Sequence, residues 1–222
     1  MIDDEDVHAR HRNRWEELGV FEEIYRESRQ RTVGLAMGLS AEDLARTVPA
    51  CPEWTVHQLI AHLAGAASDF TTGRMEGAPS QEWTARHVAE RENVPVIELL
   101  EQWNADGARV DELERIPFQL AMDVITHEAD LRGVLGRERL PDAVWQPTLT
   151  WTAVRRLPEV TAKTDFGEFG DGPITLEVDG YELWRAFFGR RSRRQMESWS
   201  WSGPAPIEKI SFFPPRDTDL VE

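Results

Sequence analysis

The stretch FQLAMDVITHEADLRGVLG, residues 118–136, decides the predicted fold. At about 100° per residue, Asp123 and His127 project among the apolar side chains of this helical pattern. The two lie four positions apart, so one is a turn above the other. Burying a carboxylate costs on the order of several kcal/mol unless it is paired or bound to a cation. The pair is therefore of a kind that a metal ion can hold. The apolar residues recur at steps of three and four, typical of one buried helical face; they are Leu120, Val124, Leu131, Val134 and Leu135.

A second helix is predicted from CPEWTVHQLIAHLAG, residues 51–65. Thr55 and Gln58 have the spacing of a capping box, so this helix is expected to begin near Val56. His62 lies at the edge of its apolar stripe. Adjacent helices of a bundle would bring this imidazole to the pair described above.

Together, His62, Asp123 and His127 are a candidate metal-ligand set. Two imidazoles and one carboxylate leave an open coordination position, as catalytic zinc sites do. The same set suits ferrous iron or nickel, so ligand type alone does not fix the metal. The alternative is a hydrogen-bonded core histidine beside an intrahelical Asp–His pair. The other histidines lie in polar surroundings and are predicted at the surface: His8, His11, His57 and His87.

The pattern of the chain predicts a mainly α four-helix bundle in residues 1–140. Four amphipathic helices are expected, at 15–37, from 56, from 95 and at 118–136. A long polar crossover, with a short helix at 81–90, separates the second from the third. Burying four such stripes together is what a four-helix bundle does.

Residues 141–222 are predicted to form a small α+β domain. RERLPDAVWQP, residues 137–147, has the composition of a linker, and residues 174–180 alternate like a strand. A helix at 181–196 is expected to be interrupted near Gly189, and residues 210–214 to form a last strand. Four arginines follow that glycine: Arg190, Arg191, Arg193 and Arg194. A solvated helix end explains this cluster most simply; the functional alternative is a patch that binds carboxylates.

The composition limits the class of protein. The chain has 222 residues, a net charge of −15 and a pI of about 4.9, so it would repel a nucleic-acid backbone. It has no apolar run near the roughly 20 residues that span a bilayer, and its first residues lack a signal-peptide core. The single cysteine, Cys51, excludes an internal disulfide and fits the cytoplasm. We expect it to pack as a small apolar side chain.

The two histidine-bearing motifs carry a family resemblance. CPEWTVHQLIAHLAG and DVITHEADLRGVLG resemble the metal-binding domain of mycothiol-dependent maleylpyruvate isomerases, which belongs to the DinB-like group of thiol-dependent metalloenzymes. The segment GYELWRAFFGRRSRRQMESWSWSG resembles the small C-terminal domain that often follows. The resemblance covers nearly the whole chain.

The resemblance implies that His62, Asp123 and His127 bind a divalent metal, zinc before nickel or iron. Maleylpyruvate isomerases carry glutamate where this chain has Asp123, and related members of the wider group use aspartate. Mycothiol is the implied cofactor: as a metal-held thiolate it would attack a small electrophilic substrate, giving isomerisation or S-transfer. Asp130 would orient the imidazole of His127.

Further expectations concern the arginines, the partners and rival functions. Arg190, Arg191 or Arg194 would bind a carboxylate of the thiol or substrate. The partners expected are these small molecules, with no nucleic acid and no membrane, and the chain would be a monomer or homodimer.

One rival function is that of a metal-dependent hydrolase, which activates water with the same ligands. Another is a non-catalytic regulatory bundle, although the histidine-and-paired-cysteine signature of zinc-dependent anti-sigma factors is absent from the sequence.

Overall fold

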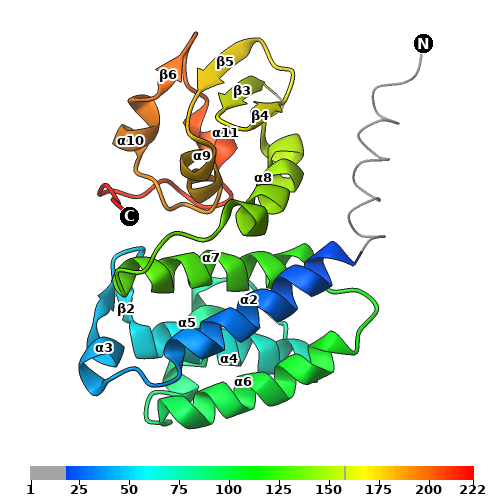
Figure 1. The fold of residues 1–222 in the computed structure, drawn as a ribbon, viewed down its shortest axis with the longest axis vertical. Helices are drawn as coiled ribbons and strands as arrows, with labels where there is room; N and C mark the ends of the chain where they lie inside the picture. Colours follow the sequence, from blue (N-terminus) through cyan, green and yellow to red (C-terminus); the bar gives the residue numbers. More distant parts are fainter. Residues whose placement is uncertain (1–18, 158) are drawn as a thin grey trace. The chain divides into compact units, whose positions relative to one another are not determined.

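The computed structural model describes residues 19–157 and 159–222, which divide into two compact units at the junction of Arg139 and Leu140. The first unit is mainly helical, and the second carries a four-stranded sheet (Figure 1), so the predicted fold class is confirmed. That the units are separate domains meeting at residue 140 stays a prediction. No helix in the described part of the chain has the length and apolar character needed to span a membrane.

Four long helices form the first unit: α2 (Val20–Ala36), α4 (Val56–Thr72), α6 (Val96–Asp111) and α7 (Phe118–Val134). Helix α4 packs against α6 and α7, and α2 packs against the same two helices. Helices α2 and α6 bury one apolar stripe, as the three- and four-residue spacing predicted, whereas α4 and α7 are buried on most sides. The fully buried side chains of this core include Tyr25, Leu59, Leu99, Trp103 and Ile125.

Shorter elements complete the first unit. They are α3 (Ala41–Ala45), β1 (Thr47–Val48), β2 (Cys51–Thr55) and α5 (Gln81–Glu90). The two strands pair antiparallel, so the segment before α4 is a short ribbon. Helix α5 lies in the crossover between α4 and α6 and packs against α4. The crossover therefore adds a fifth helix to the bundle, packed beside α4.

Side chains fix where α4 begins. The Thr55 hydroxyl accepts a hydrogen bond from the backbone N–H of Gln58, and the Gln58 side chain accepts one from the backbone N–H of Thr55. This reciprocal pair satisfies two donors that the first turn of a helix leaves without a helical partner. The predicted capping box is confirmed, and it sets the start of the helix that carries His62.

Replacing Thr55 by alanine is expected to lower the free energy of unfolding by about 0.5–2 kcal/mol, because the cap is lost. Chemical denaturation measures this change. Thr72→Ala is the matched control: it makes the same substitution at an exposed position near the other end of α4. We expect the control to change stability by no more than about 0.5 kcal/mol. Equal losses in the two variants would contradict the capping role.

The second unit is built around a small mixed sheet. Its strands are ordered β4-β3-β5-β6; β3 and β5 run parallel, and the two outer pairs are antiparallel. Helices α8 and α9 pack against each other. The elements are α8 (Asp142–Arg156), β3 (Val160–Thr164), β4 (Gly167–Phe169), β5 (Ile174–Glu177), α9 (Gly180–Phe187), α10 (Arg193–Glu197), β6 (Ser200–Trp201) and α11 (Ile207–Ile210).

Two predictions for the second unit are wrong. Residues 137–147 are not simply a linker, because α8 begins at Asp142 and includes Pro147. The helix loses one backbone hydrogen bond at that proline, and the burial of Trp145 and Leu149 offsets the loss. Residues 210–214 form no strand: α11 ends at Ile210, and irregular chain follows.

Two other predictions for this unit are confirmed. The strand expected at 174–180 is β5, which ends at Glu177. The helix expected at 181–196 is interrupted near Gly189, since α9 ends at Phe187 and α10 begins at Arg193. Gly189 has a φ of 72°, a left-handed conformation that glycine adopts without a steric penalty.

Candidate metal centre

His62 on α4 meets Asp123 and His127 on α7. His62 Nε2 lies 3.2 Å from one oxygen of Asp123, and His127 Nε2 lies 3.5 Å from the other. One ligand atom from each residue lies within 4.8 Å of the other two. Both histidines are buried, whereas the side chain of Asp123 is 29% exposed. The structure thus brings together the three residues that the helical wheels singled out.

The spacing of these atoms fits a small cation. Zinc bonds to nitrogen and oxygen of about 2.0–2.1 Å, arranged as a tetrahedron, put neighbouring ligand atoms about 3.3–3.5 Å apart. The distances from the Asp123 oxygens to the two imidazoles, 3.2 and 3.5 Å, are close to this value. Hydrogen bonds from two imidazoles to one carboxylate would have similar lengths. The positions of the imidazole protons therefore distinguish a cation site from a pair of hydrogen bonds.

The outer nitrogen of His127 fixes the proton on that ring. His127 Nδ1 lies 2.9 Å from an oxygen of Asp130, which is 1% exposed. A carboxylate only accepts hydrogen bonds, so Nδ1–H donates to it. A neutral His127 therefore turns the lone pair of Nε2 toward Asp123. The predicted contact between Asp130 and His127 is present; its orienting role stays a prediction.

A chain of buried groups fixes the proton on His62 in the same way. His87 Nε2 lies 2.9 Å from an oxygen of Asp69, and His87 Nδ1 lies 3.2 Å from His62 Nδ1. Burial lowers the pKa of His87, so its ring is neutral at pH 7. Its Nε2–H donates to Asp69, and its bare Nδ1 accepts from Nδ1–H of His62. A neutral His62 then also turns its Nε2 lone pair toward Asp123.

Two lone pairs and a carboxylate consequently converge on one point. Three acceptors facing one another repel unless protons or a cation lie between them. Protonating both His62 and His127 would leave two imidazolium ions buried side by side, and their rings are only 5.3 Å apart. A divalent cation satisfies all three acceptors at once, and all three donor types are ones that zinc, nickel and iron accept.

Aromatic rings enclose one side of this cluster. The ring centroid of Trp54 lies 4.9 Å from that of His62 and 5.8 Å from that of His127. Trp83 lies edge-on to His87, with the ring centroids 4.1 Å apart. These rings limit water around the imidazoles, while the exposed part of Asp123 leaves one direction accessible.

The prediction that His87 lies at the surface is wrong, because this residue is 0% exposed. Helix α5, which carries it, packs against α4, and Gly65 on α4 leaves room for the imidazole. His57 is half-buried and its Nε2 lies 2.8 Å from the carbonyl oxygen of Val94, so it is not simply solvated. His8 and His11 lie outside the described residues. The sequence also gave no signal that Asp69 and Trp54 lie beside the site.

Gly65→Ala should disturb the site through His87. A Cβ at position 65 would lie 2.5 Å from Cγ of His87 and 2.6 Å from its Cβ, too close for any side chain. We expect the free energy of unfolding to fall by about 1–3 kcal/mol, the usual cost of overpacking. We also expect metal affinity to fall. Denaturation and metal titration measure the two effects. Gly34→Ala, also within a helix but with open space around it, is the control and should leave metal affinity unchanged.

The arginine cluster is bound to acidic groups of its own unit. Arg191 is 1% exposed and pairs with Glu182 at 2.5 Å and Glu222 at 3.2 Å. It is therefore not part of a solvated helix end. Arg190 donates to a backbone carbonyl, and the exposed Arg194 pairs with an aspartate. That any of these three arginines binds a carboxylate of a thiol or substrate stays a prediction.

Comparisons with known proteins point to one family. A family model described as the mycothiol maleylpyruvate isomerase N-terminal domain matches residues 25–162. A crystal structure of the mycothiol-dependent maleylpyruvate isomerase is similar in fold, with a TM-score of 0.52 and 13% identity over 86% of this chain and 95% of that chain. A mutant of that enzyme with one histidine changed to alanine gives a TM-score of 0.50 and 14% identity over the same shares. No curated protein matches this chain in sequence.

Proposed function

Because the chain belongs to the mycothiol maleylpyruvate isomerase N-terminal domain family, we propose that it is a metal- and thiol-dependent isomerase or S-transferase. The family resemblance of the two histidine motifs is thereby confirmed, as is the prediction of an enzyme. The cation of the proposed enzyme lies among His62, Asp123 and His127. The substrate is a small electrophile, and the thiol is mycothiol, the thiol that the family's description names.

The observation that carries this proposal is the convergence of two buried imidazole Nε2 atoms on the carboxylate of Asp123, at 3.2 and 3.5 Å. Asp130 holds the proton of His127 on the far side of the ring, and His87 does the same for His62. Outer hydrogen bonds of this kind orient metal-binding histidines in proteins generally. Three protein ligands leave one coordination position for an exogenous group.

Charge favours a thiolate at that position. Two neutral imidazoles and one carboxylate carry one negative charge, so a divalent cation among them keeps one positive charge. An anionic sulfur would neutralise this charge beside the buried His62 and His127, where an unbalanced charge is costly. A divalent cation is a Lewis acid, and it would favour the thiolate form of a bound thiol at neutral pH.

The chain's residues would have separate tasks in the reaction. His62, Asp123 and His127 would hold the cation, and Trp54, which lies against both imidazole rings, would limit water there. The exposed side of Asp123 is where thiol and electrophile would approach. Addition of the thiolate to a conjugated cis double bond, rotation and elimination give the trans isomer and return the thiol; release of the adduct instead is S-transfer.

Cobalt substitution tests the proposal, because cobalt reports its ligands by visible absorption. Adding mycothiol to the cobalt-loaded protein should change the ligand-field bands and add a sulfur-to-cobalt charge-transfer band. An unchanged spectrum would contradict thiol binding at the metal. S-methylated mycothiol, which has no thiol proton to lose, is the control and should add no charge-transfer band. Turnover of an electrophile without any thiol would instead indicate a metal-dependent hydrolase.

A further inference from the structure

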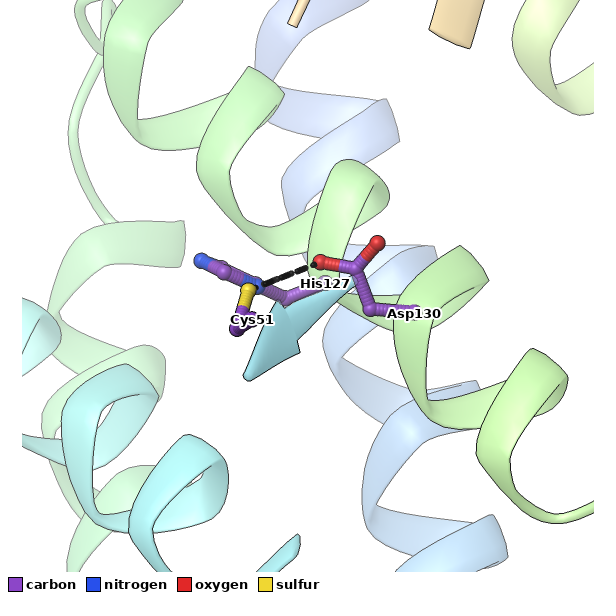
Figure 2. A group of neighbouring side chains, drawn as sticks. All are labelled: Cys51, His127 and Asp130. Atoms are coloured by element: carbon purple, nitrogen blue, oxygen red, sulfur yellow. Dashed lines mark hydrogen bonds and ion pairs between the residues drawn. The ribbon is translucent and has the colours of Figure 1, made fainter. Parts of the chain in front are cut away.

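A second group of metal-binding side chains lies on the other edge of the His127 ring. Cys51 Sγ lies 3.6 Å from Asp130 Oδ2, and His127 Nδ1 lies 2.9 Å from the same oxygen. One ligand atom from each of the three residues lies within 4.8 Å of the other two. Figure 2 shows Cys51 on strand β2 facing His127 and Asp130, which both extend from α7. Cys51 is half-buried and the other two are buried.

The donors of this group differ from those of the first site. A thiolate sulfur, an imidazole nitrogen and a carboxylate oxygen all bind zinc, and sulfur selects soft cations such as zinc and cadmium over magnesium, manganese or calcium. As thiolate and carboxylate, Cys51 and Asp130 carry two negative charges together. A divalent cation balances them, so the occupied group would be electrically neutral and suited to its buried position.

We propose that Cys51, His127 and Asp130 form a second site for thiophilic divalent cations, which competes with the first site for His127. A neutral imidazole has one lone pair, so it cannot bind a cation at Nδ1 and at Nε2 together. When the second site fills, Cys51 releases its thiol proton to solvent. The proton of His127 moves from Nδ1 to Nε2, where an oxygen of Asp123 lies 3.5 Å away and can accept it.

The two sites therefore exclude each other through the protonation of one ring. Occupation of the second site removes His127 from the first and leaves it with two protein ligands. Cadmium, a soft cation that the sulfur of the second site favours, would in this way displace the metal of the first site. The second site does not rest on the proposed thiol chemistry; only its competition with the first site does, because the two sites share His127.

Cadmium chloride added to the metal-free full-length protein tests the second site. Cys51 is the chain's single cysteine, so an ultraviolet sulfur-to-cadmium charge-transfer band reports this residue alone. In the wild type the band should saturate near one equivalent. His62→Ala should keep the band, because His62 belongs only to the first site.

Two isosteric variants on α7 form a matched pair. Asp130→Asn removes a ligand of the second site and should weaken cadmium binding, followed by this band, by at least about tenfold. Asp123→Asn removes a ligand of the first site and should leave the band in place. Circular dichroism checks the fold of each variant, and His127→Gln, which should also weaken the band, tests the second site independently.

Three outcomes would overturn the second site. The wild type could show no charge-transfer band, or the band could be lost in His62→Ala or Asp123→Asn, which would make Cys51 a ligand of the first site. Equal cadmium affinities for Asp130→Asn and Asp123→Asn would also refute it. The cobalt spectrum with mycothiol is a separate measurement on different atoms, so either proposal can fail without the other.

Discussion

Alanine at His62 or His127 is expected to leave the purified protein without its metal ion, whereas the wild type should retain close to one per chain. Each substitution removes one of three protein ligands, and metal affinity should fall by at least about 100-fold, the upper end of what loss of an outer partner costs. Metal analysis after gel filtration measures the loss. Thiol-dependent turnover should disappear with the metal.

A third histidine provides the control for this prediction. His57 is half-buried on the same helix as His62, but it donates to the carbonyl oxygen of Val94 and lies outside the ligand set. His57→Ala should therefore retain the metal. Equal metal content in the wild type, His62→Ala and His127→Ala would mean that the ligands have been assigned to the wrong residues.

His87→Leu is expected to weaken metal binding by about 10–100-fold, although His87 would not touch the metal. Leucine fills much of the space of the imidazole but offers no acceptor to Nδ1–H of His62, which lies 3.2 Å from His87 Nδ1. The buried Nδ1–H of His62 would lose its partner, and the ring could reorient to find another. Metal titration of the purified variant measures the change in affinity.

Rescue by asparagine separates orientation of His62 from packing. The Oδ1 atom of asparagine occupies nearly the position of Nδ1 in histidine and accepts a hydrogen bond. His87→Asn should therefore recover much of the metal affinity that His87→Leu loses, even where both variants unfold at similar denaturant concentrations. If both variants lose the same affinity, His87 acts only by packing.

The helical unit was largely predictable because its signals are local. The reciprocal cap of Thr55 with Gln58 marks a helix start, and it is formed as expected. The crossover helix Gln81–Glu90 also has the predicted bounds. Helix caps and apolar periodicity depend on neighbours within four residues, so they are readable without knowledge of tertiary contacts.

The meeting of His62, Asp123 and His127 was predictable for a related reason. Asp123 and His127 are polar residues at positions where a helical wheel demands apolar ones. Such a departure from a strong pattern marks a residue that is kept for something other than packing. His62 at the edge of the neighbouring stripe gave a weaker signal of the same kind.

What could not be predicted depends on contacts between distant segments. His87 lies on a short polar helix, and only the gap at Gly65 on another helix makes room for its burial. Helix α8 was missed because Pro147 and its polar neighbours are typical of a linker, while the core that buries Trp145 comes from residues far along the chain. Sequence patterns do not report such partners.

The metal- and thiol-dependent function is tested most directly by the first coordination shell of the metal, measured with and without thiol. Zinc-edge X-ray absorption on the Cys51→Ser protein, which has no cysteine, makes any nearby sulfur that of the added thiol. We expect imidazole nitrogen and carboxylate oxygen alone before mycothiol is added, and a sulfur at about 2.3 Å afterwards. A shell that lacks imidazole, or one that gains no sulfur from mycothiol, would contradict the proposed function.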